Sequence, residues 1–186
     1  VHGPCQLQGS VEISAAKNSV LKLLAASLLV PGKVTLKNIP KLNDIKTMLK
    51  LLKELGAEIQ QIGDQVEINC AMVKETKAHY DIVKTMRASI LVLGPLLARF
   101  GYGSVSLPGG CAIGARPIDM HLNGLKQLGA SIELHDGYVV AKANELLGAT
   151  IELPFPSVGA TENILMAAVF AKGESIIKNA AREPEI

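Results

Sequence analysis

Aromatic side chains are scarce in this sequence: three Tyr, three Phe and no Trp occur among 186 residues, although 48% of the residues are hydrophobic. The core of the single domain that this length allows must therefore be built from Leu, Ile, Val and Ala. A strong charge imbalance is also missing, since the net charge is +2 and no run of Lys and Arg occurs. Without a basic patch or an aromatic platform, the sequence argues against nucleic acid as a partner.

Cysteine is rare and widely spaced. The three cysteines, Cys5, Cys70 and Cys111, form neither a CxxC pair nor a Cys/His pattern with metal-ligand spacing. An odd and scattered set of this kind favours reduced thiols in a cytosol over a disulfide framework. We therefore expect no metal and no cofactor, and we expect Cys5 and Cys70 to take no part in chemistry.

Long hydrophobic runs are absent as well. The longest stretches, Val20–Val30 and Ile90–Ala98, are shorter than the ~20 residues that a membrane-spanning helix needs. Lys22 interrupts the first of them, and the first residues lack the basic start and apolar core of a signal peptide. The sequence thus predicts a cytoplasmic protein with no membrane partner.

What the sequence does contain is an internal repeat. Three similar segments begin at Gly32, Gly103 and Gly173, so the pattern recurs roughly every 70 residues. Each segment follows an apolar stretch of helical length, and these stretches are Val20–Val30, Ile90–Phe100 and Ile164–Ala171. Because they are apolar nearly all round, we expect three buried helices.

Each repeat unit has the pattern strand, buried helix, strand, amphipathic helix and closing strand pair. Val11–Ser14 is the expected first strand, and Lys46–Leu55 is the first amphipathic helix. Gly56 and Gly129 follow the last apolar residue of such helices, where a C′ glycine belongs. The expected hairpins are Glu58–Ile62 with Gln65–Asn69, and Ser131–Leu134 with Tyr138–Ala141. Three buried helices around a pseudo-threefold axis, wrapped by short sheets, form an inside-out α/β barrel.

Polar residues occupy matching positions before the three apolar stretches. Lys17, Arg87 and Ser157 each lie fifteen or sixteen residues before a repeated glycine. Helix N-termini attract anions through free N–H groups and the positive end of the helix dipole. Three converging helix ends, with Lys17, Arg87 and Arg116 nearby, therefore predict an anion site. The alternative is that these residues are ordinary helix caps, and for Ser157 taken alone that alternative is favoured.

One cysteine lies in an unusual loop, Pro108–Pro117, whose sequence is Pro-Gly-Gly-Cys-Ala-Ile-Gly-Ala-Arg-Pro. Glycine lets the backbone turn sharply and approach a ligand closely. Arg116, five residues after Cys111, carries a guanidinium that suits phosphate or carboxylate. An exposed thiol in this place can exchange a proton. A buried cysteine that only packs is the alternative, and the spacing alone does not decide between the two.

This loop, together with Ser14–Asn18, Lys84–Ser89 and Ser157–Thr161, resembles the UDP-N-acetylglucosamine enolpyruvyl transferase family, in order along essentially the whole chain. The resemblance implies the inside-out α/β fold that this family shares with EPSP synthase. It also implies transfer of the enolpyruvyl group of phosphoenolpyruvate to the 3-hydroxyl of UDP-N-acetylglucosamine with release of phosphate. That reaction is the first committed step of peptidoglycan synthesis.

The resemblance further implies roles for single residues. Cys111 matches the cysteine that donates a proton to the methylene carbon of phosphoenolpyruvate, and Lys17, Asn18 and Arg116 match residues that contact this substrate. The residues that would hold the uridine nucleotide are Arg87, Arg116, Pro117, Ile118, Asp119, Met120, Phe155, Pro156, Ser157 and Val158. The family often has Lys-Val where this chain has Phe155-Pro156, which puts a lysine contact to the diphosphate in doubt. His121 either borders the site or merely starts a helix.

The resemblance covers one lobe of a two-lobe enzyme. We expect residues 1–186 to form that lobe, with the first few residues belonging to the second lobe and the third repeat interrupted near Ile186. In the family, the second lobe supplies the base and further phosphate-binding arginines. Two alternatives stay open: an EPSP synthase-like transferase, which should lack the cysteine loop, and a non-catalytic sugar-nucleotide-binding module.

Overall fold

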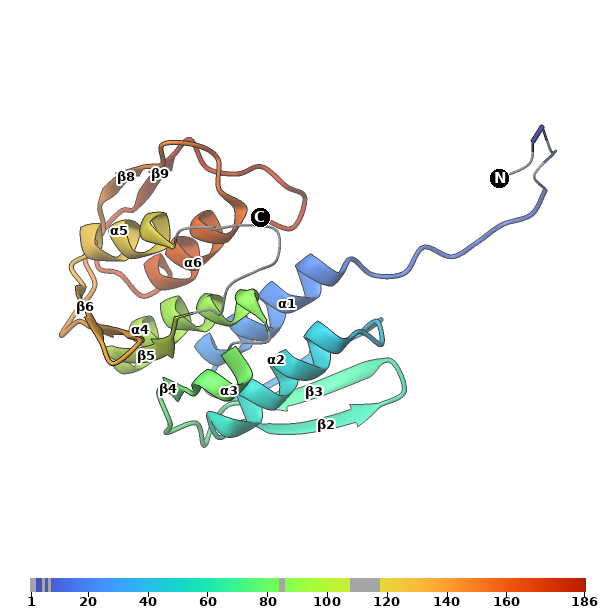
Figure 1. Ribbon diagram of the computed structural model, residues 1–186, viewed down its shortest axis with the longest axis horizontal. Helices are drawn as coiled ribbons and strands as arrows, with labels where there is room; N and C mark the ends of the chain where they lie inside the picture. The colour runs from blue at the N-terminus through green and yellow to red at the C-terminus, as the bar shows by residue number, and fades with distance from the viewer. Residues whose placement is uncertain (1–2, 5, 7, 84–85, 108–117) are drawn as a thin grey trace.

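The computed structural model describes residues 3–4, 6, 8–83, 86–107 and 118–186. Three repeat units follow one another along the chain (Figure 1). The first holds α1 (Lys17–Ala26), the 3-10 helix η1 (Ser27–Leu29), β1 (Lys33–Leu36), α2 (Asn43–Glu54), β2 (Glu58–Ile62) and β3 (Gln65–Asn69). The second holds β4 (Lys77–Ala78), α3 (Tyr80–Val83), the 3-10 helix η2 (Arg87–Val92), α4 (Leu93–Phe100), β5 (Tyr102–Ser106), α5 (Asp119–Gln127), β6 (Ser131–His135) and β7 (Tyr138–Lys142). The third holds β8 (Thr150–Glu152), α6 (Val158–Ala168) and β9 (Ile176–Lys178).

Each unit carries its own small sheet, and the pairing repeats with the sequence. The first sheet has the order β1-β3-β2 and is antiparallel, and in the second, β5, β7 and β6 are arranged in the same way. The second sheet adds β4 parallel to β5, just as β8 runs parallel to β9 in the third. The two predicted hairpins are confirmed, the first with its exact bounds.

The core lies between the helices and is aliphatic, as the composition predicts. Its fully buried side chains include Leu24 of α1, Leu96 of α4 and Ile164 of α6. Helices α4 and α6 cross closely because α4 has a glycine at the contact: a Cβ placed on Gly94 would lie 2.4 Å from the Asn163 carbonyl oxygen. The three apolar segments therefore do form the buried centre of an inside-out α/β fold.

Two glycines end the amphipathic helices as predicted. Gly56 and Gly129 have φ values of +100° and +97°, which an L side chain rarely adopts. After α2, Gly56 N donates to Lys53 O and Ala57 N donates to Leu52 O, both at 2.9 Å. The same two bonds follow α5, so both helices end in a Schellman motif.

Several predicted bounds are wrong. The apolar stretches Val20–Val30 and Ile164–Ala171 extend past the ends of their α-helices at Ala26 and Ala168. The helix starts at Lys17 and Val158 agree with the N-termini that the repeat predicts at Lys17 and Ser157. The expected helix Ile90–Phe100 is divided into η2 and α4, with Pro95 in the first turn of α4, where its missing N–H costs no helical bond. Hydrophobic periodicity locates the buried turns of a helix but not its polar first turn.

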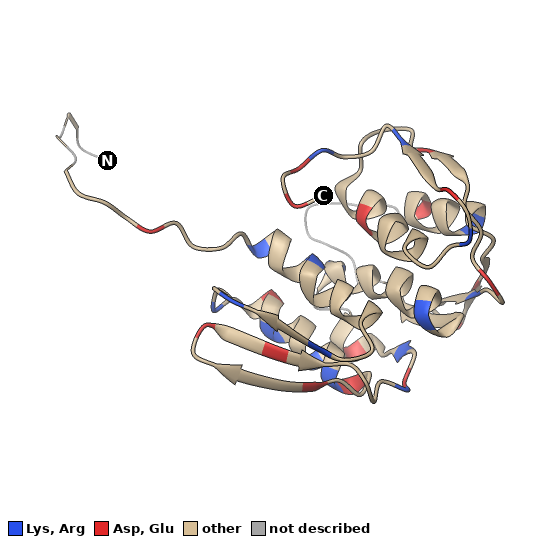
Figure 2. Ribbon diagram, turned by 180° about the vertical axis from the view of Figure 1, so that it is seen from behind, with Lys and Arg blue, Asp and Glu red and all other residues tan. Residues whose placement is uncertain are grey.

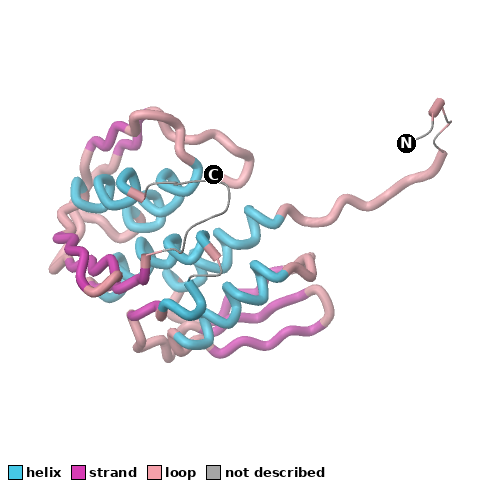
Figure 3. Tube along the Cα trace, in the orientation of Figure 1, coloured by secondary structure: helices cyan, strands magenta, loops and turns pink. Residues whose placement is uncertain are grey.

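The predicted strand Val11–Ser14 is also wrong. This segment has no strand assignment, and it extends away from the helices as a loop (Figure 3). Val11 is 87% exposed and Ile13 is 94% exposed. Alternating β-branched residues favour an extended backbone, but a strand also needs a hydrogen-bonded neighbour, and the described residues supply none here.

Charged residues are distributed over the molecule with both signs interspersed (Figure 2). No helix in the described part of the chain is long and apolar enough to cross a membrane. Among the same residues, no group of three or more His, Cys, Asp or Glu side chains could hold a metal ion.

Candidate functional site

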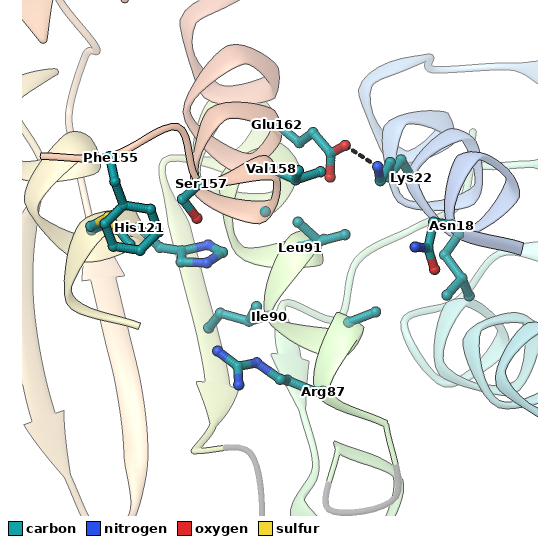
Figure 4. A pocket seen from close by; sticks show the side chains of 14 residues that line it. Asn18, Lys22, Arg87, Ile90, Leu91, His121, Phe155, Ser157, Val158 and Glu162 are labelled. Carbon is teal, nitrogen blue, oxygen red and sulfur yellow. Dashed lines mark ion pairs between the residues drawn. The ribbon is translucent and has the colours of Figure 1, made fainter. Parts of the chain in front are cut away.

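A pocket of about 450 Å³ lies where four helices begin (Figure 4). Its wall includes residues from the first turns of α1, η2, α5 and α6: Asn18, Arg87, Ala88, Met120, His121, Val158 and Gly159. Phe155, Ser157 and several apolar side chains complete it. The convergence that the repeat predicts is thus present, with α5 as an additional helix start.

The helix starts around this pocket favour an anionic ligand. The N-cap residues of α1, η2 and α5 make no side-chain capping hydrogen bond among the described residues, whereas the Ser157 hydroxyl accepts a hydrogen bond from Ala160 N at 3.4 Å and caps α6. Uncapped first-turn N–H groups and aligned helix dipoles attract negative charge. The Arg87 guanidinium adds a full positive charge at the same pocket. Ser157 therefore caps α6, as the sequence favoured for this residue taken alone, and it also lines the pocket.

His121 is buried in the pocket wall and carries little charge. Its Nδ1 lies 3.1 Å from the Asn163 side-chain nitrogen. Burial, with a smaller contribution from the nearby Arg87 charge, lowers the pKa of His121 to about 4, although Asp119 acts in the opposite direction. The imidazole is therefore neutral at neutral pH.

An ionic cluster closes the opposite side of the pocket. Lys22 of α1 pairs with Glu162 of α6 (Figure 4). Its Nζ also lies 2.9 Å from Glu185 Oε1 in the C-terminal segment. Burial raises the pKa of Glu162, although Lys22 acts against the shift. The pKa of Lys22 is raised: burial alone would lower it, but the two carboxylates outweigh that effect. The cluster holds α1, α6 and the C-terminal segment together beside the pocket.

The predicted site residues are only partly brought together. Six of them line the pocket: Asn18, Arg87, Met120, Phe155, Ser157 and Val158. Lys17 Nζ instead pairs with Asp44 Oδ2 at 2.7 Å, and both side chains are exposed. Pro156 lines a second cavity with residues 179–183, while Ile118 and Asp119 line neither. Cys111, Arg116 and Pro117 lie outside the described residues.

Two charged residues of the pocket were not predicted as site residues. Lys22 lies five residues after Lys17, and Glu162 lies five residues after Ser157. They therefore occupy the same position in two repeats, one turn further along their helices. Two opposite charges at equivalent positions of two apolar helices are the signal that could have identified this pair.

Among the described residues the one cysteine is Cys70, and its thiol is unreactive. Cys70 is fully buried, with its Sγ 3.9 Å from the Ser27 hydroxyl. Burial raises the pKa of Cys70, so little thiolate forms at neutral pH. That Cys70 takes no part in chemistry stays a prediction, and Cys5 lies outside the described residues.

Comparison with known proteins identifies close relatives. The chain is 53% identical over 186 residues to the UDP-N-acetylglucosamine 1-carboxyvinyltransferase of Thermodesulfovibrio yellowstonii and 57% identical over 187 residues to that of Tolumonas auensis. Both matches cover 100% of this chain and 44% of the relative. The chain thus spans less than half the length of the curated relatives it matches.

Solved structures share the fold at low identity. The enolpyruvyl transferase NikO of Streptomyces tendae superimposes with a TM-score of 0.82 at 21% identity, covering 99% of this chain and 43% of NikO. The EPSP synthase of Acinetobacter baumannii gives 0.76 at 19% identity, covering 95% and 42%. The family profile described as EPSP synthase (3-phosphoshikimate 1-carboxyvinyltransferase) matches residues 1–186. The chain therefore belongs to the EPSP synthase family of carboxyvinyltransferases.

Proposed function

We propose that this chain is one lobe of a UDP-N-acetylglucosamine 1-carboxyvinyltransferase. The observation that carries the proposal is 53–57% identity, over the whole chain, to relatives of that name. The pocket agrees with it, because uncapped helix starts and Arg87 suit a ligand rich in phosphate and carboxylate. The enzyme would work in the cytoplasm, at the first committed step of peptidoglycan synthesis and thus of cell-wall growth.

The proposed reaction is an addition followed by an elimination. The 3-hydroxyl of UDP-N-acetylglucosamine attacks C2 of phosphoenolpyruvate, its proton passes to a base, and Cys111 donates a proton to C3. Loss of a proton from C3 then expels inorganic phosphate and restores the double bond. A thiol can donate a proton and, as the thiolate, take one up again, so Cys111 suits both proton transfers.

The remaining predicted residues would hold the two substrates. Lys17, Asn18 and Arg116 would bind phosphoenolpyruvate, and Arg87 would bind the nucleotide together with Arg116. The other nucleotide ligands would be Pro117, Ile118, Asp119, Met120, Phe155, Pro156, Ser157 and Val158. Lys17 would exchange its exposed pair with Asp44 for the substrate phosphate, since an exposed ion pair contributes only ~1 kcal/mol or less.

A second lobe completes the proposed enzyme. The relatives are more than twice as long as this chain, and the remaining length would supply the base and further phosphate ligands. The exposed segment that contains Val11 and Ile13 would then pack on that second lobe. Without the second lobe only one side of the proposed active site is present. That side alone neither excludes water nor orients the acceptor hydroxyl.

The rival activity is that of EPSP synthase, which shares the fold and whose family profile matches. The identity of the solved EPSP synthase, 19%, is far below the 53–57% of the relatives of the proposed type. Phosphate release from phosphoenolpyruvate by the full-length enzyme would separate the two. Release should require UDP-N-acetylglucosamine, and release that instead requires 3-phosphoshikimate would refute the proposal.

The same assay tests the role of Cys111. Cys111→Ala should abolish turnover while nucleotide binding, measured by calorimetry, persists. Cys70→Ala is the matched control, since Cys70 is buried away from the pocket. The epoxide fosfomycin should label Cys111 and not Cys70. Unchanged turnover in Cys111→Ala would remove the proposed general acid.

A further inference from the structure

Asn163, a fully buried residue of α6, uses both ends of its side-chain amide. Its Oδ1 accepts a hydrogen bond from Gly94 N at 2.7 Å, and its Nδ2 donates to Ile90 O at 3.2 Å. The same Nδ2 lies 3.1 Å from Nδ1 of His121. One side chain thus joins η2, α4 and α5 to α6 at the back of the pocket.

The backbone partners fix which end of the amide faces the histidine. A backbone N–H can only donate and a carbonyl can only accept, so Oδ1 must face Gly94 N and Nδ2 must face Ile90 O. The second hydrogen of Nδ2 then points to His121 Nδ1, which must accept it. An accepting Nδ1 carries no proton, so the proton of the neutral ring is on Nε2.

The charged surroundings act in the same direction. A protonated ring would place an Nδ1–H against the Nδ2–H of Asn163 and would add a cation beside Arg87. Asp119 is the acidic neighbour that favours protonation, while Glu162 across the pocket is paired with Lys22. Burial and Arg87 outweigh Asp119, so the pKa of His121 falls to about 4.

The proton on Nε2 faces the side of the pocket that a glycine leaves open. A Cβ placed on Gly159, in the first turn of α6, would lie 3.2 Å from His121 Cε1 and 3.4 Å from Nε2. A larger residue would therefore cover the ring. Among the described residues, Nε2 has no hydrogen-bond partner of its own.

We propose that Asn163 is a positioning residue that holds His121 as the neutral Nε2–H tautomer, so that the pocket offers an uncharged donor to an oxygen of the ligand. The ligand class rests on the proposed function: the acceptor is an oxygen of the sugar nucleotide bound at the start of α6. The tautomer follows from the contacts of Asn163 alone.

The test uses the full-length protein with ¹⁵N-labelled histidine. Proton–nitrogen correlation spectra report which ring nitrogen carries the proton, and His121→Gln identifies the signal. We expect Nε2–H from pH 5.5 to 8 with no titration in that interval. A proton on Nδ1, or titration of His121 at or above its ordinary pKa of 6.5, would overturn the proposal.

Asn163→Asp tests the positioning role through the tautomer and the pKa of His121, which loss of packing alone does not change in the predicted way. Its carboxylate would accept from Nδ1–H, so the proton should shift to Nδ1 and the apparent pKa of His121 should rise by more than one unit. Asn163→Leu is the control that removes the bonds without adding charge. An unchanged tautomer and pKa in Asn163→Asp would refute the positioning role, and the wild-type spectrum decides the question if this variant does not fold.

Nucleotide binding tests the donor itself. His121→Leu, which has no donor at this place, should weaken calorimetric binding of UDP-N-acetylglucosamine by roughly tenfold, the value of one hydrogen bond. If wild-type protein shows the Nε2–H tautomer but does not turn over this nucleotide, the proposed function fails and the positioning role stands. Equal binding by wild type and His121→Leu would show that Nε2–H meets no ligand oxygen, and this outcome would overturn the donor role.

Discussion

Arg99 shows how the position of a single residue in the fold decides its role. From the sequence it is one more arginine at the end of an apolar helix. In the structure its guanidinium donates to Leu28 O and to Cys70 O, both at 2.9 Å, and so ties α4 to the first repeat. Arg99 is therefore a structural residue, unlike Arg87 at the pocket.

Replacing Arg99 should destabilise the fold without affecting the pocket. Arg99→Met removes two charge-assisted hydrogen bonds, those to Leu28 O and Cys70 O, and we expect the free energy of unfolding to fall by about 2 kcal/mol. Chemical denaturation measures this loss. Lys126→Met, at an exposed position of α5, is the matched control and should change stability little. Equal stability of the two variants would mean that the Arg99 bonds contribute nothing.

His121 should make the stability of the fold depend on pH. Its pKa is 6.5 in the unfolded chain and about 4 in the folded protein, so the unfolded state binds more protons between these values. The stabilising contribution is complete above pH 6.5 and is lost as pH falls towards 4. It amounts to roughly 3 kcal/mol.

The measurement is the difference in unfolding free energy between wild type and His121→Gln at pH 7 and pH 4.5. A difference is needed because the raised pKa of Glu162 acts with the opposite sign in the same interval. The wild-type advantage should shrink at pH 4.5. An advantage that is the same at both pH values would contradict the buried, neutral histidine.

At this scale, sequence reasoning finds residues whose role is local. Gly56 and Gly129 were predicted as helix ends because the αL position demands glycine whatever surrounds it, and the hydroxyl of Ser157 caps its own helix. The pairing of His121 with Asn163 was not predicted, because 42 residues separate them and only the fold brings them together.

Among the elements, the crossing of α4 and α6 depends on one glycine. A Cβ on Gly94 would lie 2.4 Å from Asn163 O and 2.5 Å from its Oδ1. Gly94→Ala should therefore push the two helices apart and destabilise the protein by roughly 2 kcal/mol or more. It should also weaken the hydrogen bond from Gly94 N that orients Asn163.

Gly32→Ala is the control for this prediction. A Cβ on Gly32 meets nothing within 4 Å, so its effect on unfolding should be small. Thermal unfolding of both variants gives the comparison. A midpoint for Gly94→Ala as high as that of Gly32→Ala would show that the helices move apart at no cost.

Element types were predictable where the hydrophobic pattern has a clear period. The two hairpins and the apolar helices follow from alternation and from continuous apolar stretches, and the structure confirms them. The start of α1 at Lys17 followed from the matching positions in the repeat rather than from hydrophobic periodicity. The 3-10 geometry of η2 was not predicted, since local helix type leaves no periodic signal. The predicted strand Val11–Ser14 failed because a strand needs a partner.

For the molecule as a whole, we predict that this chain alone binds but does not turn over its substrates. It spans 44% of the relatives it matches, and in the proposed mechanism the remaining length supplies the base. A phosphate-release assay with phosphoenolpyruvate and UDP-N-acetylglucosamine should show no turnover, while calorimetry detects weak nucleotide binding. Turnover at the rate of the full-length enzyme would refute the two-lobe mechanism.

The fold of the whole lobe was more predictable than its site. A repeat detected in the sequence implies similar units around an axis. This prediction of the architecture holds even when the predicted bounds of each element are wrong by a few residues. A site does not tolerate such errors. That Lys17 binds substrate stays a prediction; its pair with Asp44 was not predicted, because a helix start fixes the position of a lysine's Cα but not the direction of its long side chain.

The contacts of α6 also determine the order in which the chain can fold. Glu162 and Asn163 come late in the sequence, yet their partners Lys22, Ile90 and Gly94 precede them by 140, 73 and 69 residues. During synthesis these partners leave the ribosome first. The buried groups of the first two repeats therefore lack their partners until the third repeat has been synthesised. Folding by such distant contacts is slow, and the repeats should therefore complete their cores together rather than one after another as they are synthesised.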